Sequence, residues 1–403
     1  MTNDDIKKIS KDSDPDAQFE LGFKNYMGVE IIHGKRAYVD HETAFNCFKI
    51  AAEKEHPKAL YYLARMFEKG EHVNADPNES LKYYQKSSKA GFGPASAFLG
   101  LQFDSGKQVK RDVEKAFQYF ELAIQQGEES ANYFKGKYLL NGELKGGKQT
   151  KDGIRCLEIS AQKGYVPAQF DLGMLYMDGV DALQNYEKGI YWLTEAAKKD
   201  NQKAQNKLAH CYYYGIGVDV NMNGAYGWWR RAAEPLNGAL PSAEALMNCG
   251  ICNMNGKGAE KDVSRAENYL LKASRLGLPH AQFCLGILYK DHDVKIQAHA
   301  WLNIAATGKH ENAIKERNQL EKNMTPLEVR EAQQIAEKIA NQEINGITAV
   351  STENIRSNGK DVVENLKKLG FFVQDQELLE SLGGNPNALS DEEFEAVFGE
   401  SRD

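Results

Sequence analysis

Apolar residues between about 15 and 310 recur with the period of one helical face, in units of similar length. Each unit opens with an alanine, and a leucine follows four positions later in six of the eight units. An aromatic residue is common eight positions after the alanine and a glycine eleven positions after it, which places them on one face and at the end of a helix. The opening alanines are Ala17, Ala59, Ala95, Ala131, Ala168, Ala204, Ala245 and Ala281.

A second helical pattern follows each glycine, after a loop that often ends in aspartate, as at Asp112. It reads small residue, two variable positions, aromatic residue, three variable positions and small residue, for example Ala225, Trp228 and Ala232. Small residues let two helices approach closely, and large ones fill the space between hairpins. A repeat every 36 to 42 residues therefore predicts helical hairpins that stack, because one hairpin cannot bury both of its faces.

These recurring positions resemble the SEL-one-like repeat (SLR) family, a relative of the tetratricopeptide repeats. The resemblance covers roughly residues 15–310 and implies an all-α fold, a right-handed α-solenoid of about eight helix-turn-helix repeats. Unit one carries an insertion near 29–39 and unit six another at 235–242, while unit four replaces the core leucine by Lys135. Unit eight lacks the glycine, as expected of a terminal repeat.

The stretch after the array predicts a capping helix over about 326–341. Thr325 can cap it, Pro326 can be its first residue and Glu328 can complete a capping box. The solenoid domain is therefore expected to span 15–342. Residues 343–403 form an acidic tail with short helical patterns at 361–369, 376–382 and 390–398. We expect either a weakly structured solubilising tail or a partner-binding or self-docking peptide that uses Phe371, Phe372, Phe394 and Phe398.

The charge distribution limits the classes of partner. The tail holds 5 lysines and arginines against 13 aspartates and glutamates, a net charge of −8, whereas the rest of the chain has a net charge of +1. Neither part forms a basic nucleic-acid surface. The N-terminus has no apolar signal core and no stretch approaches 18 apolar residues, so we expect a cytoplasmic protein without a membrane span.

Candidate chemistry is weak by comparison. Cys249 and Cys252 form a C-x-x-C pair, and His280 and Cys284 complete the residue types of a zinc site. They fall at staggered heights on two neighbouring helices, so core packing is the preferred interpretation over zinc binding or a redox pair. The glycine-rich segment 142–149 resembles a phosphate loop but has Gln149 where the metal-binding Ser or Thr belongs. We therefore expect no catalytic residue, metal or cofactor.

The remaining candidate is a protein-binding surface. The first helices of such solenoids conventionally line the concave side, and we take their positions off the core stripe as possible contacts. A second cluster holds Trp228 and Trp229, of which Trp228 takes the structural aromatic position. The candidate contacts are Tyr62, Arg65, Phe98, Phe134, Lys137, Asp171, Met174, Lys207, His210, Tyr214, Trp229 and Arg230. Equally, half of the aromatics could be packed between repeats.

The family resemblance implies a non-catalytic adaptor or scaffold that binds one or more proteins or peptides. Three alternatives stay open: a dedicated inhibitor or immunity-type protein for one toxin or enzyme, a hydrolase-like enzyme, and self-assembly through the acidic tail.

Overall fold

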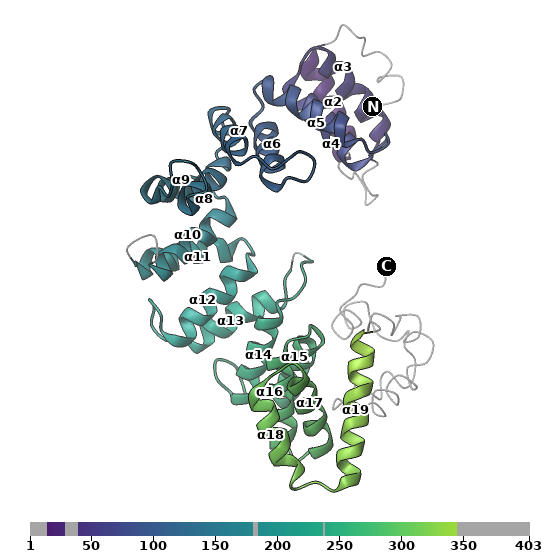
Figure 1. Cartoon of the computed structure of the whole chain (residues 1–403), viewed down its shortest axis with the longest axis vertical. Coiled ribbons are helices and arrows are strands. Elements are labelled where there is room, and N and C mark those ends of the chain that lie inside the picture. Colours follow the sequence, from purple (N-terminus) through teal and green to yellow (C-terminus); the bar gives the residue numbers. More distant parts are fainter. Residues whose placement is uncertain (1–13, 29–38, 180–183, 237, 345–403) are drawn as a thin grey trace. The chain divides into compact units, whose positions relative to one another are not determined.

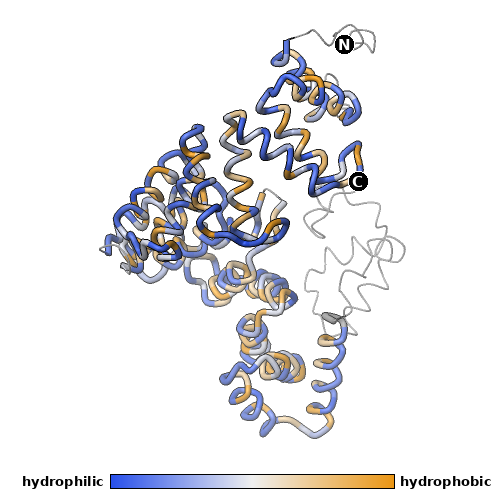
Figure 2. The backbone as a smooth tube through the Cα atoms, turned by 45° about the horizontal axis from the view of Figure 1, so that its top comes forward, coloured by the Kyte–Doolittle hydropathy of each residue, from blue (hydrophilic) through white to orange (hydrophobic). Residues whose placement is uncertain are grey.

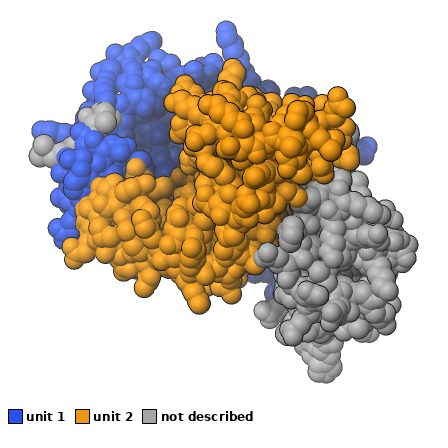
Figure 3. Space-filling model, turned by 90° about the horizontal axis from the view of Figure 1, so that it is seen from below, with its two compact units in different colours: residues 1–201 blue, residues 202–403 orange. Residues whose placement is uncertain are grey.

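The computed structural model describes residues 14–28, 39–179, 184–236 and 238–344, and all regular structure in these ranges is helical. The chain divides into two compact units, 1–201 and 202–403 (Figure 3). Each unit is built from stacked helical hairpins, so the all-α repeat fold predicted from the sequence is confirmed. The acidic tail from residue 345 onward, with its helical patterns and phenylalanines, lies outside the described residues, as does most of the insertion near 29–39.

The described residues of unit one form five hairpins, each made of two consecutive helices (Figure 1). The pairs are α2 (Pro15–Met27) with α3 (His41–Glu53), α4 (Pro57–Lys69) with α5 (Pro77–Lys89), α6 (Gly93–Ser105) with α7 (Val113–Gln125), α8 (Ala131–Asn141) with α9 (Thr150–Gln162), and α10 (Val166–Asp178) with α11 (Tyr186–Lys198). In the first four of these hairpins the second helix packs against the first helix of the next hairpin, as between α5 and α6.

The part of unit two that the structure describes forms three further hairpins and two additional helices. The pairs are α12 (Gln202–Tyr214) with α13 (Met222–Ala233), α14 (Ala243–Asn255) with α15 (Val263–Arg275), and α16 (Pro279–Asp291) with α17 (Lys295–Thr307). The sequence pattern did not predict α18 (Glu311–Glu321) as a separate helix. Both α18 and α19 (Pro326–Ile344) pack against α17. At the start of α19, the Thr325 N–H donates to Glu328 Oε2 at 2.7 Å and the Glu328 N–H to Thr325 Oγ1 at 3.3 Å.

The helix ends follow from local chemistry. Gly106 ends α6 in the left-handed region, with φ of 66°, and its N–H donates to the carbonyl of Gln102 at 3.1 Å. Most second helices begin with a side chain that accepts a hydrogen bond from a free N–H of the first turn. Those capping residues are Asp40, Asp76, Asp112, Asn185, Asn221 and Asp262.

The core of each hairpin is a close approach between a very small residue on the first helix and a large one on the second. The small residue follows the core leucine position and is glycine in six repeats and alanine in the other two. A Cβ added at Gly100 would lie 2.6 Å from the ring of Phe120, and one at Gly173 would lie 2.9 Å from Leu193 Cγ. Along the helices, hydrophobic positions alternate with hydrophilic ones (Figure 2). The large residues are Phe48, Tyr84, Phe120, Leu157, Leu193, Trp229, Leu270 and Leu302, all fully buried or nearly so.

This buried position comes one residue after the aromatic that the sequence pattern emphasises. The expectation that Trp228 holds the structural position and Trp229 is free for contacts is therefore wrong. Trp229 is 3% exposed and packs in the core of its hairpin, whereas Trp228 is only half-buried. One residue along a helix turns a side chain by about 100°, so a shift of one position exchanges a core residue for a peripheral one.

We predict that Gly250→Ala destabilises unit two although alanine is the better helix former. Its Cβ would lie 2.7 Å from Leu270 Cγ and 3.2 Å from the Ala266 carbonyl oxygen, an overlap that costs about 1–3 kcal/mol in a packed core. Gly227→Ala is the matched control, because nothing lies within 4 Å of its added Cβ. It should stabilise the protein by about 0.5–1 kcal/mol. Urea unfolding of both variants measures this, and equal effects of the two changes would refute the role of the close approach.

A second prediction concerns a buried carboxylate in unit two. Burial raises the pKa of Glu267, and the hydrogen bond donated by the Tyr289 hydroxyl opposes this only in part. A raised pKa means that Glu267 favours folding at low pH and that this contribution is lost as the pH rises through the folded pKa. Glu267→Gln should therefore be more stable than the wild type at pH 8, with the difference shrinking as the pH falls towards 4. Thermal melting across this range measures the trend, and a difference independent of pH would contradict it.

Candidate functional site

The candidate contact residues lie in both units, and the structure gives them different surroundings. In unit one, Tyr62 on α4 is half-buried in the aromatic core of the first two repeats. Its ring lies 5.3 Å from that of Phe48 and 5.4 Å from that of Phe23. The Arg65 guanidinium lies over the Tyr62 ring at 5.9 Å. Tyr62 therefore contributes mainly to packing, and Arg65 covers its outer face.

Phe98 and Phe134 occupy the corresponding positions of repeats three and four and are also half-buried. Phe98 stacks on Tyr84 with ring centroids 3.8 Å apart, and Phe134 stacks on Phe120 at 4.9 Å. Tyr84 and Phe120 are the large residues inside the preceding hairpins. Each phenylalanine thus fills the junction between two hairpins, which is the packing alternative that the sequence left open.

Lys137 and Asp171 neutralise each other across successive first helices. Lys137 Nζ donates to Asp171 Oδ2 at 2.8 Å, and the Tyr133 hydroxyl donates to the same oxygen at 3.0 Å. Burial, followed by the Asp171 carboxylate, raises the pKa of Tyr133. These groups tie α8 to α10, while Met174 lies half-buried on α10. The charges at this position are already satisfied within the protein.

Unit two holds a group of contacting side chains at the C-terminal end of α12 that we call the Tyr214 cluster. It consists of His210, Tyr213, Tyr214, Trp229 and Glu244. The rings of His210 and Tyr214 are parallel, with centroids 6.1 Å apart, and the His210 ring meets Trp229 edge-on at 5.3 Å. The Tyr213 ring packs against Trp229, with centroids 5.4 Å apart, and against Tyr214 at 4.9 Å. Tyr214 is 65% exposed and Trp229 only 3%, so the cluster presents one accessible ring above a buried one.

Glu244 connects this cluster to the next repeat. His210 Nε2 lies 2.9 Å from Glu244 Oε1, and this hydrogen bond lowers the pKa of the Glu244 carboxyl. Lys207 is half-buried on the same first helix, and Arg230 is exposed on α13. Tyr213 and Glu244 were not among the contacts expected from the sequence. Glu244 directly precedes the opening alanine of its repeat, a position that the repeat pattern does not mark.

The cysteines and the histidine of the zinc-like set have different surroundings in the structure. Cys249 and Cys252 are buried, and burial raises the pKa of Cys252 to about 11, which disfavours the nucleophilic thiolate. His280 pairs with His310, with Nδ1 and Nε2 2.9 Å apart. Within the described ranges no three His, Cys, Asp or Glu side chains are grouped as metal ligands. No helix there is both long and apolar enough to cross a membrane.

Comparison with known proteins places the repeats in a family. Six segments match the family model described as Sel1 repeat: residues 15–56, 57–92, 94–128, 166–201, 202–234 and 243–278. Chitin synthase regulatory factor 3 of Schizosaccharomyces pombe is 29% identical over 276 residues, which cover 66% of this chain and 28% of that protein. The ERAD-associated E3 ubiquitin-protein ligase component HRD3B of Arabidopsis thaliana is 31% identical over 30% of this chain and 18% of its own length.

This chain therefore spans less than a third of the length of these curated relatives. Among solved structures, a Sel1 repeat protein from Oxalobacter formigenes is similar, with a TM-score of 0.54 and 25% identity. That similarity covers 79% of this chain and 90% of the other. The matched segments take in more than half of the sequence and coincide with the observed hairpins, and the chain belongs to the Sel1 repeat family.

Proposed function

We propose that this chain is a non-catalytic scaffold that binds one or more proteins through the first helices of its repeats. The observation that carries the proposal is the Tyr214 cluster, in which an accessible tyrosine is held by groups that are themselves fixed. Tyrosine is enriched at the energetic centres of protein interfaces because it offers a large apolar ring and a polar hydroxyl. The proposed contact surface includes Lys207 and excludes the buried Trp229.

The physical basis is preorganisation. Trp229 and Glu244 fix the His210 ring, and His210 and Tyr213 flank Tyr214. A side chain that is already ordered loses less conformational entropy when a partner binds, so more of the contact energy appears as affinity. The hydrogen bond between His210 and Glu244 joins α12 to α14, and the contact surface therefore extends over two repeats.

The names of the relatives support a regulatory role for such binding. One relative is named as a regulatory factor, and another is a component of a ligase assembly. A third, 34% identical over 23% of this chain, is named as a negative regulator of exopolysaccharide production in Rhizobium leguminosarum bv. viciae. We propose that this chain likewise acts by holding another protein and not by catalysing a reaction.

Replacing the exposed tyrosine tests this proposal. Affinity capture from native lysate with the whole chain, followed by titration of the purified partner, should show at least a tenfold loss of affinity for Tyr214→Ala, the size of effect expected at an interface hot spot. The ring is 65% exposed, so the melting temperature should stay within about 2 °C of the wild type. A partner held with unchanged affinity would rule out the Tyr214 cluster as the contact.

Tyr191→Ala is the matched control. Tyr191 lies on the second helix α11, and its ring is 56% exposed, so its loss removes a similar accessible aromatic from another surface. The control should retain the partner at wild-type affinity, and equal losses for both variants would point to nonspecific aromatic binding. Phe134→Ala should instead lower the melting temperature, because Phe134 stacks on the buried Phe120 ring.

A further inference from the structure

The fourth repeat, formed by α8 and α9, departs from the others at the centre of its core. The position four residues after the opening alanine is buried in every other repeat and holds leucine or cysteine. Here it holds Lys135, and the segments that match the Sel1 repeat leave residues 129–165 uncovered. A long cationic side chain at a core position leaves space that a leucine would fill.

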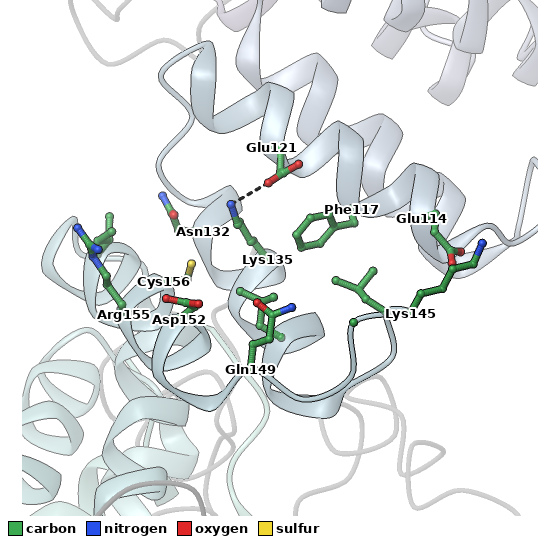
Figure 4. A pocket seen from close by; sticks show the side chains of 14 residues that line it. Glu114, Phe117, Glu121, Asn132, Lys135, Lys145, Gln149, Asp152, Arg155 and Cys156 are labelled. Atoms are coloured by element: carbon green, nitrogen blue, oxygen red, sulfur yellow. Dashed lines mark hydrogen bonds and ion pairs between the residues drawn. The ribbon is translucent and has the colours of Figure 1, made fainter.

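A hollow of about 680 Å³ opens at this place, within unit one (Figure 4). It is bordered by α7, α8, the loop between α8 and α9, and one side of α9 as far as Ile159. Its volume lies in the range of small-molecule sites. Phe117, Leu139, Leu144 and Ile159 supply apolar surface. Lys135 projects into it between Phe117 and Asn132. The hollow therefore offers both an apolar wall and a charged group.

The Lys135 ammonium has N–H groups that no protein acceptor uses in the described structure. Lys135 Nζ donates to Glu121 Oε1 at 2.9 Å and lies over the Phe117 ring at 5.6 Å. Its side chain is 27% exposed, against 41% for Glu121, so the cation is the less hydrated member of the pair. An ammonium carries three N–H groups, and Glu121 accepts only one of them, so two remain for a ligand in the hollow.

The start of α9 adds further donors. Gln149 takes the N-cap position, and its side chain makes no capping hydrogen bond, whereas Asp112 and Asn185 cap the neighbouring second helices. Uncapped N–H groups and the helix dipole favour an anion there. Arg155, on the next turn, forms no ion pair with any residue that the structure describes. The rim carboxylates Glu114 and Asp152 are exposed, so water and salt screen their repulsion.

We propose that the fourth repeat binds a small amphipathic organic anion. Its apolar body would lie against Phe117, Leu139 and Leu144, and its carboxylate or sulfonate would accept hydrogen bonds from Lys135 and the start of α9. This site is separate from the proposed protein contact. Lys135 and Leu139 lie on one face of α8, whereas Phe134 and Lys137 project from the opposite face, since each residue turns the helix by about 100°.

The test uses the whole chain and two fluorescent probes with the same ring system. 8-Anilinonaphthalene-1-sulfonate is the anionic probe, and N-phenyl-1-naphthylamine is its neutral counterpart. The anionic probe should bind at one saturable site with at least about fivefold higher affinity than the neutral one, because only it can pair with Lys135. Equal affinities, or no saturable binding of the anionic probe, would overturn the proposal.

Three variants separate charge from space. Lys135→Met removes the charge and keeps an unbranched side chain that is one atom shorter, so it should abolish the preference for the anionic probe while neutral binding persists. Lys135→Leu restores the repeat's leucine and should weaken both probes about tenfold or more. Lys137→Met is the control, because Lys137 does not line the hollow, and it should bind like the wild type. Circular dichroism and melting establish that each variant is folded. Wild-type affinity of the anionic probe for both Lys135 variants would refute the site.

Discussion

The close approach of the two helices within each hairpin is the constraint on which the rest of the structure depends. A glycine or alanine on the first helix lets a phenylalanine, tyrosine, tryptophan or leucine of the second helix lie directly against the first-helix backbone. At Gly136 and Gly153 both helices contribute a glycine, and a Cβ on either would lie about 3 Å from the carbonyl oxygen of the other. This contact sets the distance between the helices, and the distance in turn determines which side chains face the neighbouring hairpin.

The same constraint leaves few first-helix side chains for recognition. One face of each first helix meets its own second helix, and another meets the preceding hairpin, where leucines such as Leu99 and Leu172 are fully buried. Polar side chains then link successive first helices, as in Lys137 with Asp171 and His210 with Glu244. In unit one the aromatic candidates pack into hairpin junctions, whereas in unit two Tyr214 stays accessible at the C-terminal end of α12. Partner binding is therefore expected where a large side chain of a first helix is not needed for packing and stays accessible.

The periodic part of the fold could be predicted from the sequence because each residue that marks a helix start or end recurs about every 36 residues. A position that is a weak indication in one repeat becomes a strong one when it recurs in most of them. The opening alanines marked all eight hairpins, and glycines marked the ends of seven of the first helices; the match to the Sel1 repeat supports the family assignment. Features that occur once were harder to predict. The α18 helix has no repeat to support it, and the exchange of roles between Trp228 and Trp229 depends on a helical phase difference of one residue. Lys135 was visible as a departure, but a hollow depends on how α7 and α9 pack around it, which no single residue specifies.

The central claim is that partner binding uses first helices in unit two while the hairpin cores stay closed. Hydrogen–deuterium exchange of the whole chain, with and without the protein that co-purifies with it, tests this most directly. The account predicts added protection of backbone amides in α12 and α14, around Tyr214 and Glu244, with α13 and α15 unchanged. Protection confined to the second helices, or to unit one, would contradict it.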